Sequence, residues 1–175
     1  MKTTKTLTLL SAMTAMLVGT SSYADLSVRF IEGAPKDTFI IENTGKCALD
    51  NVVVDIDLAS SDGKLFFDTT AAGAGVEVFQ PFEVRSGQFT VANQSISDGN
   101  DAISLNVAQL AVGGNISFTI DVDDQLSNGD WGQIRISGSE INGAQARLTL
   151  ADQIILTGTF GNNNRATIKT GNCRI

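Results

Sequence analysis

The sequence predicts an all-β protein in which two antiparallel sheets pack face to face as a single β-sandwich domain. Apolar and polar residues alternate along many short segments, which is typical of strands with one buried face. These segments recur at spacings of about ten residues and are separated by turns rich in Gly, Asn and Asp. Only residues 107–113 ("VAQLAVG") hint at a helical turn. Together these observations favour a sandwich over any fold that contains helices.

Alternation is clearest in residues 50–59 and 114–124. The first segment turns one set of apolar side chains inward, namely Val52, Val54, Ile56 and Leu58. The second segment does the same with Ile116, Phe118, Ile120 and Val122. Residues 69–88 are rich in Gly and Ala and predict a loop with weak strands. Further strands are expected at 26–31, 37–43, 64–68, 76–79, 89–91, 102–107, 133–137, 144–150, 154–160 and 166–169.

The N-terminus has the three parts of a secretory signal peptide. Lys2 and Lys5 form a basic start, residues 7–18 are mostly apolar, and Ser22-Tyr23-Ala24 supplies the small-x-small pattern that precedes a signal-peptidase cleavage position, with Asp25 following. The apolar part is too short to span a membrane. We therefore expect residues 1–24 to be removed and residues 25–175 to form one exported domain, in the periplasm or outside the cell.

Charge limits the partners that the exported domain can have. The chain has a formal net charge of −7, and the predicted signal peptide contains two Lys and no acidic residue. Its removal would make the domain still more acidic, which disfavours nucleic acid and anionic membrane surfaces as partners. No second long apolar run follows, so membrane insertion is not expected.

Cys47 and Cys173 are the only cysteines. An isolated pair in an exported chain usually forms one structural disulfide. A metal or redox pair would need close spacing or His partners, and the chain contains no His. We therefore predict a disulfide between Cys47 and Cys173.

Most catalytic arrangements are excluded by composition. Without His there is no Ser-His-Asp or Cys-His arrangement and no His-ligated metal. A pair of carboxylates could still hydrolyse glycosides, but the Glu residues are dispersed and the Asp residues lie mostly on outward strand faces. The sequence therefore predicts a protein that is not an enzyme.

Residues 119–132 ("TIDVDDQLSNGDWG") are the one stretch in which candidate functional residues crowd together. Asp121 and Asp123 continue the outward face of the preceding strand, where polar residues are ordinary. Residues 124–130 then read as a hairpin connection centred on Asn128-Gly129. In this first interpretation the stretch is a polar turn.

Two other interpretations give the stretch a ligand. Asp side chains and turn carbonyls could supply oxygens to Ca²⁺, although the spacing does not match an EF-hand, because Leu126 stands where that loop requires Gly. Such a site would need help from a second loop, through Asp62 or through Asp98 and Asp101. Alternatively, the only Trp, Trp131, could stack on a sugar ring. The candidate cation ligands are Asp121, Asp123, Asp124 and Asp130.

Several segments carry a resemblance to a known group of proteins. The segments "ADLSVRFIEGAPKDTFIIENTG", "GAGVEVFQPFEV", "FTIDVDD" and "SGSEINGAQARLTL" resemble small exported bacterial proteins labelled "aggregation factor core". That label refers to the core protein of sponge aggregation factor, which implies calcium-dependent cell adhesion. The segment "ENTGKCALDNVVVDI" is similar to the opening of Ig-like adhesion modules, which implies an Ig-like sandwich. The resemblance assigns no site residues.

The expected function is that of a secreted, non-enzymatic adhesion or binding module, assisted by a cation. Its partner would be a protein or a glycan at a cell surface. Two alternatives remain open: a carbohydrate-binding module and a periplasmic hydrolase that uses paired carboxylates.

Overall fold

The computed structural model describes residues 24–70, 80–92, 96–125 and 138–171. The predicted signal peptide lies almost entirely outside these ranges, so export stays a prediction. No helix in the described part is long and apolar enough to cross a membrane. The described strands are β1 (Ala24–Ile31), β2 (Asp37–Asn43), β3 (Leu49–Asp57), β4 (Phe66–Asp68), β5 (Glu83–Ser86), β6 (Thr90–Val91), β7 (Ala102–Leu110), β8 (Asn115–Asp123), β9 (Gln145–Thr149), β10 (Ile155–Thr159) and β11 (Arg165–Gly171).

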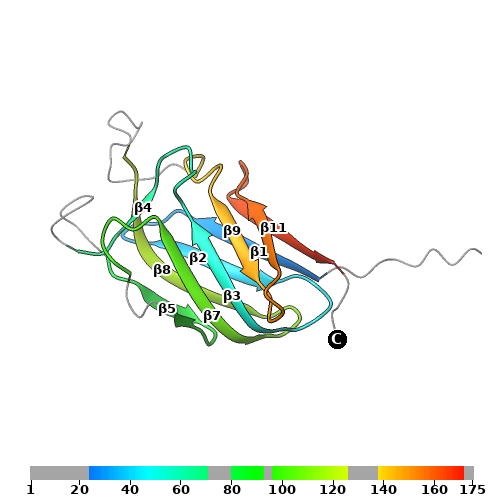
Figure 1. Ribbon diagram of the computed structural model, residues 1–175. Coiled ribbons are helices and arrows are strands. Elements are labelled where there is room, and N and C mark those ends of the chain that lie inside the picture. Colours follow the sequence, from blue (N-terminus) through cyan, green and yellow to red (C-terminus); the bar gives the residue numbers. More distant parts are fainter. Residues whose placement is uncertain (1–23, 71–79, 93–95, 126–137, 172–175) are drawn as a thin grey trace, which may run out of the picture.

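These strands form two antiparallel sheets, one of which curls like half a barrel. Sheet A has the order β11-β1-β2-β8-β4, and β5 also pairs with β8. Sheet B has the order β10-β9-β3-β7-β6. Figure 1 shows them as two layers, with β1, β2 and β8 in one layer and β3, β7 and β9 in the other. The prediction of an all-β fold with two antiparallel sheets is confirmed.

The core lies between the sheets and includes the residues that alternation predicted to face inward in the two long segments. Within β8, Phe118 is fully buried, and its ring centroid lies 5.1 Å from that of Phe39 and 5.0 Å from that of Phe82. The other predicted inward residues are each at most 3% exposed: Val52, Val54, Ile56, Leu58, Ile116, Ile120 and Val122. The predicted phase of both long segments is therefore confirmed.

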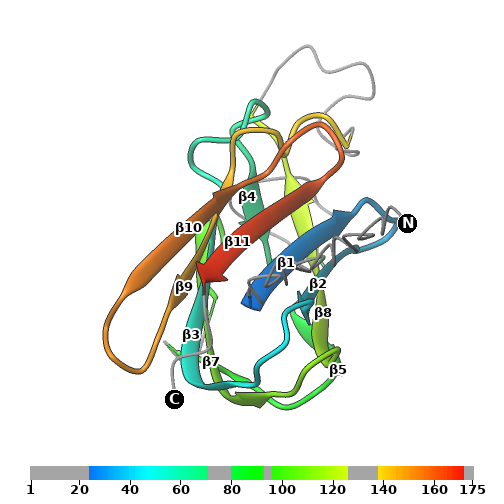
Figure 2. The same ribbon diagram turned by 90° about the vertical axis from the view of Figure 1, so that its right-hand side faces the viewer.

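The hairpin of β10 and β11 joins the two sheets along one side. β10 pairs with β9 in sheet B, whereas β11 pairs with β1 in sheet A. Figure 2 shows β10 and β11 running side by side. A Cβ atom on Gly158 would lie 2.6 Å from the carbonyl oxygen of Thr167, so only glycine permits this close approach of the two backbones.

Two expectations about local structure are wrong. The hint of a helical turn at 107–113 is not borne out, because β7 continues to Leu110 and is followed by a turn that the N–H of Gly114 closes on the carbonyl of Ala111. Asp123, predicted to face solvent, is 2% exposed. The predicted strands at 76–79 and 133–137 lie outside the described residues.

A buried amide holds the loop that contains Cys47. The Nδ2 of Asn43 donates to the carbonyls of Cys47 at 2.7 Å and of Leu110 at 2.9 Å, and its Oδ1 accepts the N–H of Gly45 at 3.1 Å. The first residues of β1 link this loop to the end of β11. Thr44 donates its N–H to the carbonyl of Asp25 at 2.9 Å.

Gly171, the last residue described, pairs with Ala24. The end of β11 and the Cys47 loop therefore meet at the same end of β1. Cys173 lies two residues further on, outside the described residues. Its disulfide with Cys47 stays a prediction, and the positions of the flanking residues favour it.

Candidate functional site

Acidic side chains gather on the outer face of sheet A where β4 pairs with β8. The register places Asp68 opposite Asp121, and Asp123 lies two residues further along β8. Residues opposite each other in an antiparallel pair share a face of the sheet. The intervening pair of Phe67 and Val122 belongs to the core. Asp68, Asp121 and Asp123 therefore lie together on the face turned away from the core.

Asp98 joins them from the loop between β6 and β7. Its Oδ1 accepts the N–H of Thr69 at 2.9 Å, and its carboxyl group shares a hydrogen bond with that of Asp68. This loop supplies the second segment that a cation site was predicted to need. We call the set of Asp68, Asp98, Asp121 and Asp123 the acidic corner.

The acidic corner is unusually well shielded from water for a group of carboxylates. Asp68 is 0% exposed and Asp123 2% exposed, while Asp121 is half-buried. The Oδ1 of Asp68 accepts the N–H of Thr70 at 3.3 Å. Its Oδ2 is buried and has no hydrogen-bond partner among the described residues. An ionised oxygen in such a place is costly unless a proton or a cation neutralises it.

Shielding and mutual repulsion both raise the affinity of these carboxyl groups for protons. Burial raises the pKa of Asp68 to about 6. The hydrogen bond that protonated Asp68 donates to Asp98 and the charges of Asp123 and Asp98 raise the pKa further, whereas the N–H of Thr70 lowers it. Burial likewise raises the pKa of Asp121 to about 7, with the charges of Asp123 and Asp68 adding to it. The acidic corner thus concentrates negative charge that the surroundings do not fully compensate.

The structure brings some of the predicted cation ligands together. Asp121 and Asp123 share the face described above, and Asp124, the next residue, is 1% exposed. Asp130 and Trp131 lie outside the described residues, so their predicted roles are untested. No three acidic or cysteine side chains in the described ranges are arranged as a metal-ligand set. A cation at the acidic corner would therefore complete its shell with carbonyl oxygens or water, both of which Ca²⁺ accepts.

Sequence reasoning missed Asp68 and only partly identified the second loop. Asp68 ends a short apolar run, and nothing in the sequence shows that it pairs with Asp121; the β4–β8 register decides this. Of the acids suggested for the second loop, Asp98 reaches the acidic corner. Asp62 instead accepts the Nδ2 of Asn142 at 2.8 Å.

Asp37, a second feature that the sequence did not reveal, is a buried acid near the acidic corner. It is 4% exposed and lies at the start of β2. Its Oδ1 accepts the N–H of Gly33 at 3.0 Å and its Oδ2 that of Val122 at 3.2 Å. Burial raises its pKa to about 8, and the charges of Asp121 and Glu32 add to this, although the two N–H donors oppose it.

We predict that this carboxyl group makes stability fall as the pH rises. The folded state keeps the Asp37 proton up to about pH 8, whereas the unfolded chain releases it near the ordinary value of 3.8. Between these values the unfolded state binds fewer protons, so the free energy of unfolding decreases by up to about 1.4 kcal/mol per pH unit for this group. Asp37→Asn should therefore flatten the profile measured by urea denaturation from pH 5 to pH 8.

The slope is the quantity to compare, because the asparagine amide places a donor beside a backbone N–H and shifts stability at every pH. Asp50→Asn, which neutralises an exposed acid of β3, serves as the control and should leave the slope unchanged. Equal slopes for the wild type and Asp37→Asn would show that the proton is not held at Asp37.

Comparisons with known proteins found no match: no protein-family model, no curated protein and no solved structure is significantly similar to this chain. The resemblance to aggregation factor core proteins therefore receives no support from them.

Proposed function

We propose that this protein is an exported, non-enzymatic β-sandwich of the Ig-like class that acts as an adhesion or binding module, and that Ca²⁺ binds at its acidic corner. The module would work in the periplasm or outside the cell, on a protein or glycan at a cell surface. The N-terminal signal-peptide pattern supports export, and the antiparallel sandwich agrees with such a module.

The carboxyl group of Asp68 is the main support for a bound cation. It is completely buried, its Oδ2 has no hydrogen-bond partner in the described part of the chain, and Asp98 and Asp121 lie beside it. Removing a carboxylate from water without a counter-charge costs several kcal/mol. A hard divalent cation offsets that cost, and carboxylate oxygens are the ligands that Ca²⁺ prefers.

The same geometry weighs against the hydrolase alternative. A carboxylate-based glycosidase needs two carboxyl groups about 5–10 Å apart on either side of a substrate cleft. The described part of the molecule has a pocket of about 690 Å³ in sheet B, and no acidic residue lines it. The acids of the acidic corner are instead largely buried, where a substrate could not pass between them.

The proposal predicts selective stabilisation by Ca²⁺. With few protein ligands, the affinity should be weak, on the order of 10⁻⁴–10⁻³ M. At ten times the Kd, mass action would then add about 1.4 kcal/mol to the free energy of unfolding, provided that the unfolded chain does not bind. The measurement is a thermal melt of the wild type with and without millimolar Ca²⁺ at constant ionic strength, with Mg²⁺ in parallel.

Two double variants make this test specific. Asp68→Asn/Asp121→Asn removes two carboxylates from the acidic corner and should abolish the Ca²⁺ shift. Asp50→Asn/Asp152→Asn removes the same charge from exposed positions elsewhere and should retain it. No shift in the wild type, an equal shift with Mg²⁺, or a shift that survives in the first variant would each contradict a Ca²⁺ site at the acidic corner.

A further inference from the structure

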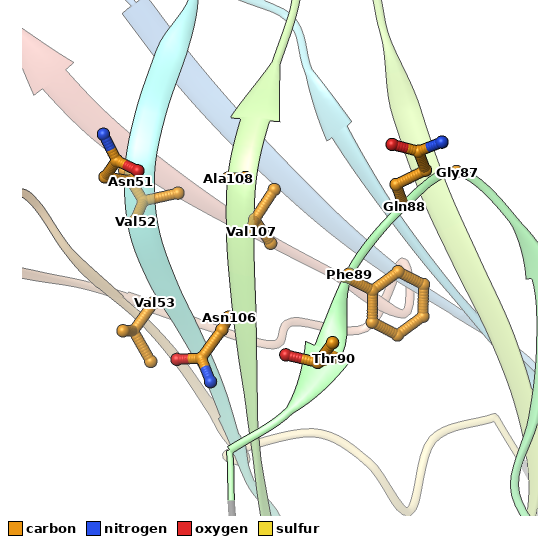
Figure 3. A pocket seen from close by; sticks show the side chains of 10 residues that line it. All are labelled: Asn51, Val52, Val53, Gly87, Gln88, Phe89, Thr90, Asn106, Val107 and Ala108. Carbon is orange, nitrogen blue, oxygen red and sulfur yellow. The ribbon is translucent and has the colours of Figure 1, made fainter.

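A pocket of about 690 Å³ lies where β3, β7 and β6 run side by side, and outward residues of sheet B line it together with the core residues Val52 and Val107. Val53, Asn106 and Thr90 form a row across the three strands, because Asn106 pairs with both of the others. Asn51 and Ala108 lie one step along the same face, and Gln88 precedes Thr90 on the chain. Figure 3 shows these side chains around the pocket.

Two backbone irregularities shape the pocket. Asn51 has a positive φ of 51° within β3, and the β3–β7 pairing passes from Asp50 to Val52 without it. Asparagine tolerates this left-handed conformation better than most residues. On the opposite side, Gly87 has a φ of 78°, and a Cβ atom there would lie 2.4 Å from the Cγ2 of Ile116. The segment that leads into β6 can therefore lie where it does only with glycine at this position.

The described residues that line the pocket are uncharged, although the protein as a whole is acidic. Their polar side chains are the amides of Asn51, Gln88 and Asn106 and the hydroxyl of Thr90. All four are exposed, and none makes a side-chain hydrogen bond to another described residue. Each amide offers donors and an acceptor at once, and the hydroxyl offers both as well.

We propose that this pocket binds a neutral saccharide. Sugar hydroxyl groups both donate and accept hydrogen bonds, so they match amides and a hydroxyl that have no side-chain hydrogen-bond partner among the described residues. The C–H faces of a sugar ring match the apolar surface of Val53 and Ala108. A lining without charge gives no advantage to phosphate, uronic acid or amine ligands. Convergent polar groups around a partly apolar hollow are typical of ligand sites.

The site differs from a stacking platform. The ring of Phe89 packs in the interior against Phe82 and Phe118, with centroids 6.3 Å away in each case, and so does not supply a flat surface for a sugar. Recognition would depend on hydrogen bonds and on the small apolar surface of Val53 and Ala108, so a single short oligosaccharide should bind weakly. Useful affinity would come from several modules engaging a polymer.

The test uses the mature wild-type protein and a panel of immobilised oligosaccharides, which includes neutral hexose and N-acetylhexosamine polymers and acidic glycans. Binding is read by surface plasmon resonance and confirmed in solution by saturation-transfer NMR. We expect reproducible binding to at least one neutral polymer. Asn51→Gly, which keeps the left-handed backbone and removes the amide, and Asn106→Ala should each weaken it about tenfold, the effect of losing a hydrogen bond of roughly 1.4 kcal/mol.

Asn162→Ala removes an exposed amide from the turn between β10 and β11 and should bind like the wild type. No neutral glycan bound at millimolar concentration, binding confined to acidic glycans, or binding that both pocket variants retain would overturn the assignment. The saccharide proposal rests on the proposed role as a binding module, but different experiments test the Ca²⁺ site and the saccharide site, so either can be contradicted without the other. Asp68→Asn/Asp121→Asn tests Ca²⁺ in sheet A, and the pocket variants test the saccharide in sheet B.

Discussion

Phe118→Ala should lower the free energy of unfolding by about 3–5 kcal/mol, the range observed when a fully buried phenylalanine is truncated. Phe118 is 0% exposed and lies in the middle of β8, between β2 and β5. Its ring stacks on Phe39 with an interplanar angle of 18° and also contacts Phe82. Truncation would remove these ring contacts and leave a cavity that a close-packed core cannot refill. Urea denaturation monitored by circular dichroism measures the loss.

Thr119→Ala is the matched control, because it changes the neighbouring residue on the opposite face of the same strand. The Oγ1 of Thr119 is buried without a hydrogen-bond partner among the described residues, so its removal forfeits no hydrogen bond in this part of the chain. We expect a change below about 1 kcal/mol. Equal losses for the two variants would mean that the two faces of β8 contribute equally, contrary to the burial pattern.

Removing the predicted disulfide should have an effect of similar size. A bond between Cys47 and Cys173 would close a loop of 126 positions, and the chain-entropy model assigns about 4–5 kcal/mol to such a loop, less any strain in the folded state. Cys47→Ser/Cys173→Ser should therefore unfold at a markedly lower urea concentration than the oxidised wild type. Reduction of the wild type should reproduce the loss.

Intact mass after alkylation under non-reducing, denaturing conditions tests the bond itself. The wild-type protein should carry no alkyl group before reduction and two after it. Two modified thiols before reduction would contradict the pairing. Cys47→Ser alone is the informative control, because it should leave Cys173 open to alkylation and should lose as much stability as the double variant.

Alternation along the two longest segments was sufficient to predict which of their side chains belong to the core. Successive side chains of a strand point to opposite faces, so Val54 and Phe118 could be placed inside from their neighbours alone. The turns were predicted for an equally local reason: Gly, Asn and Asp accept backbone conformations that other residues avoid. The helical turn expected at 107–113 failed, because β-sheet pairing with β3 extends β7 to Leu110.

Alternation says which face a side chain occupies but not what covers that face. Asp123 was expected in solvent because it follows the polar phase of β8. In the folded chain it lies opposite Phe66 of β4, and both residues are at most 5% exposed. Only the neighbours that the tertiary fold supplies decide whether an outward position is exposed to solvent or buried, and burial makes the ionised form of such an acid more costly.

The sequence by itself determined the strand content, the inward residues, the excluded catalytic chemistries and the crowding of Asp residues near the end of β8. The tertiary structure alone decided the order of the strands, the meeting of Asp68 and Asp98 with Asp121, and the row of Val53, Asn106 and Thr90 beneath the pocket. The physical reason is that alternation and turn chemistry are local, extending over a few residues. Sheet pairing joins segments far apart in the chain, and Asp68, Asn106 and Thr90 look in the sequence like ordinary polar positions on a strand or in a turn.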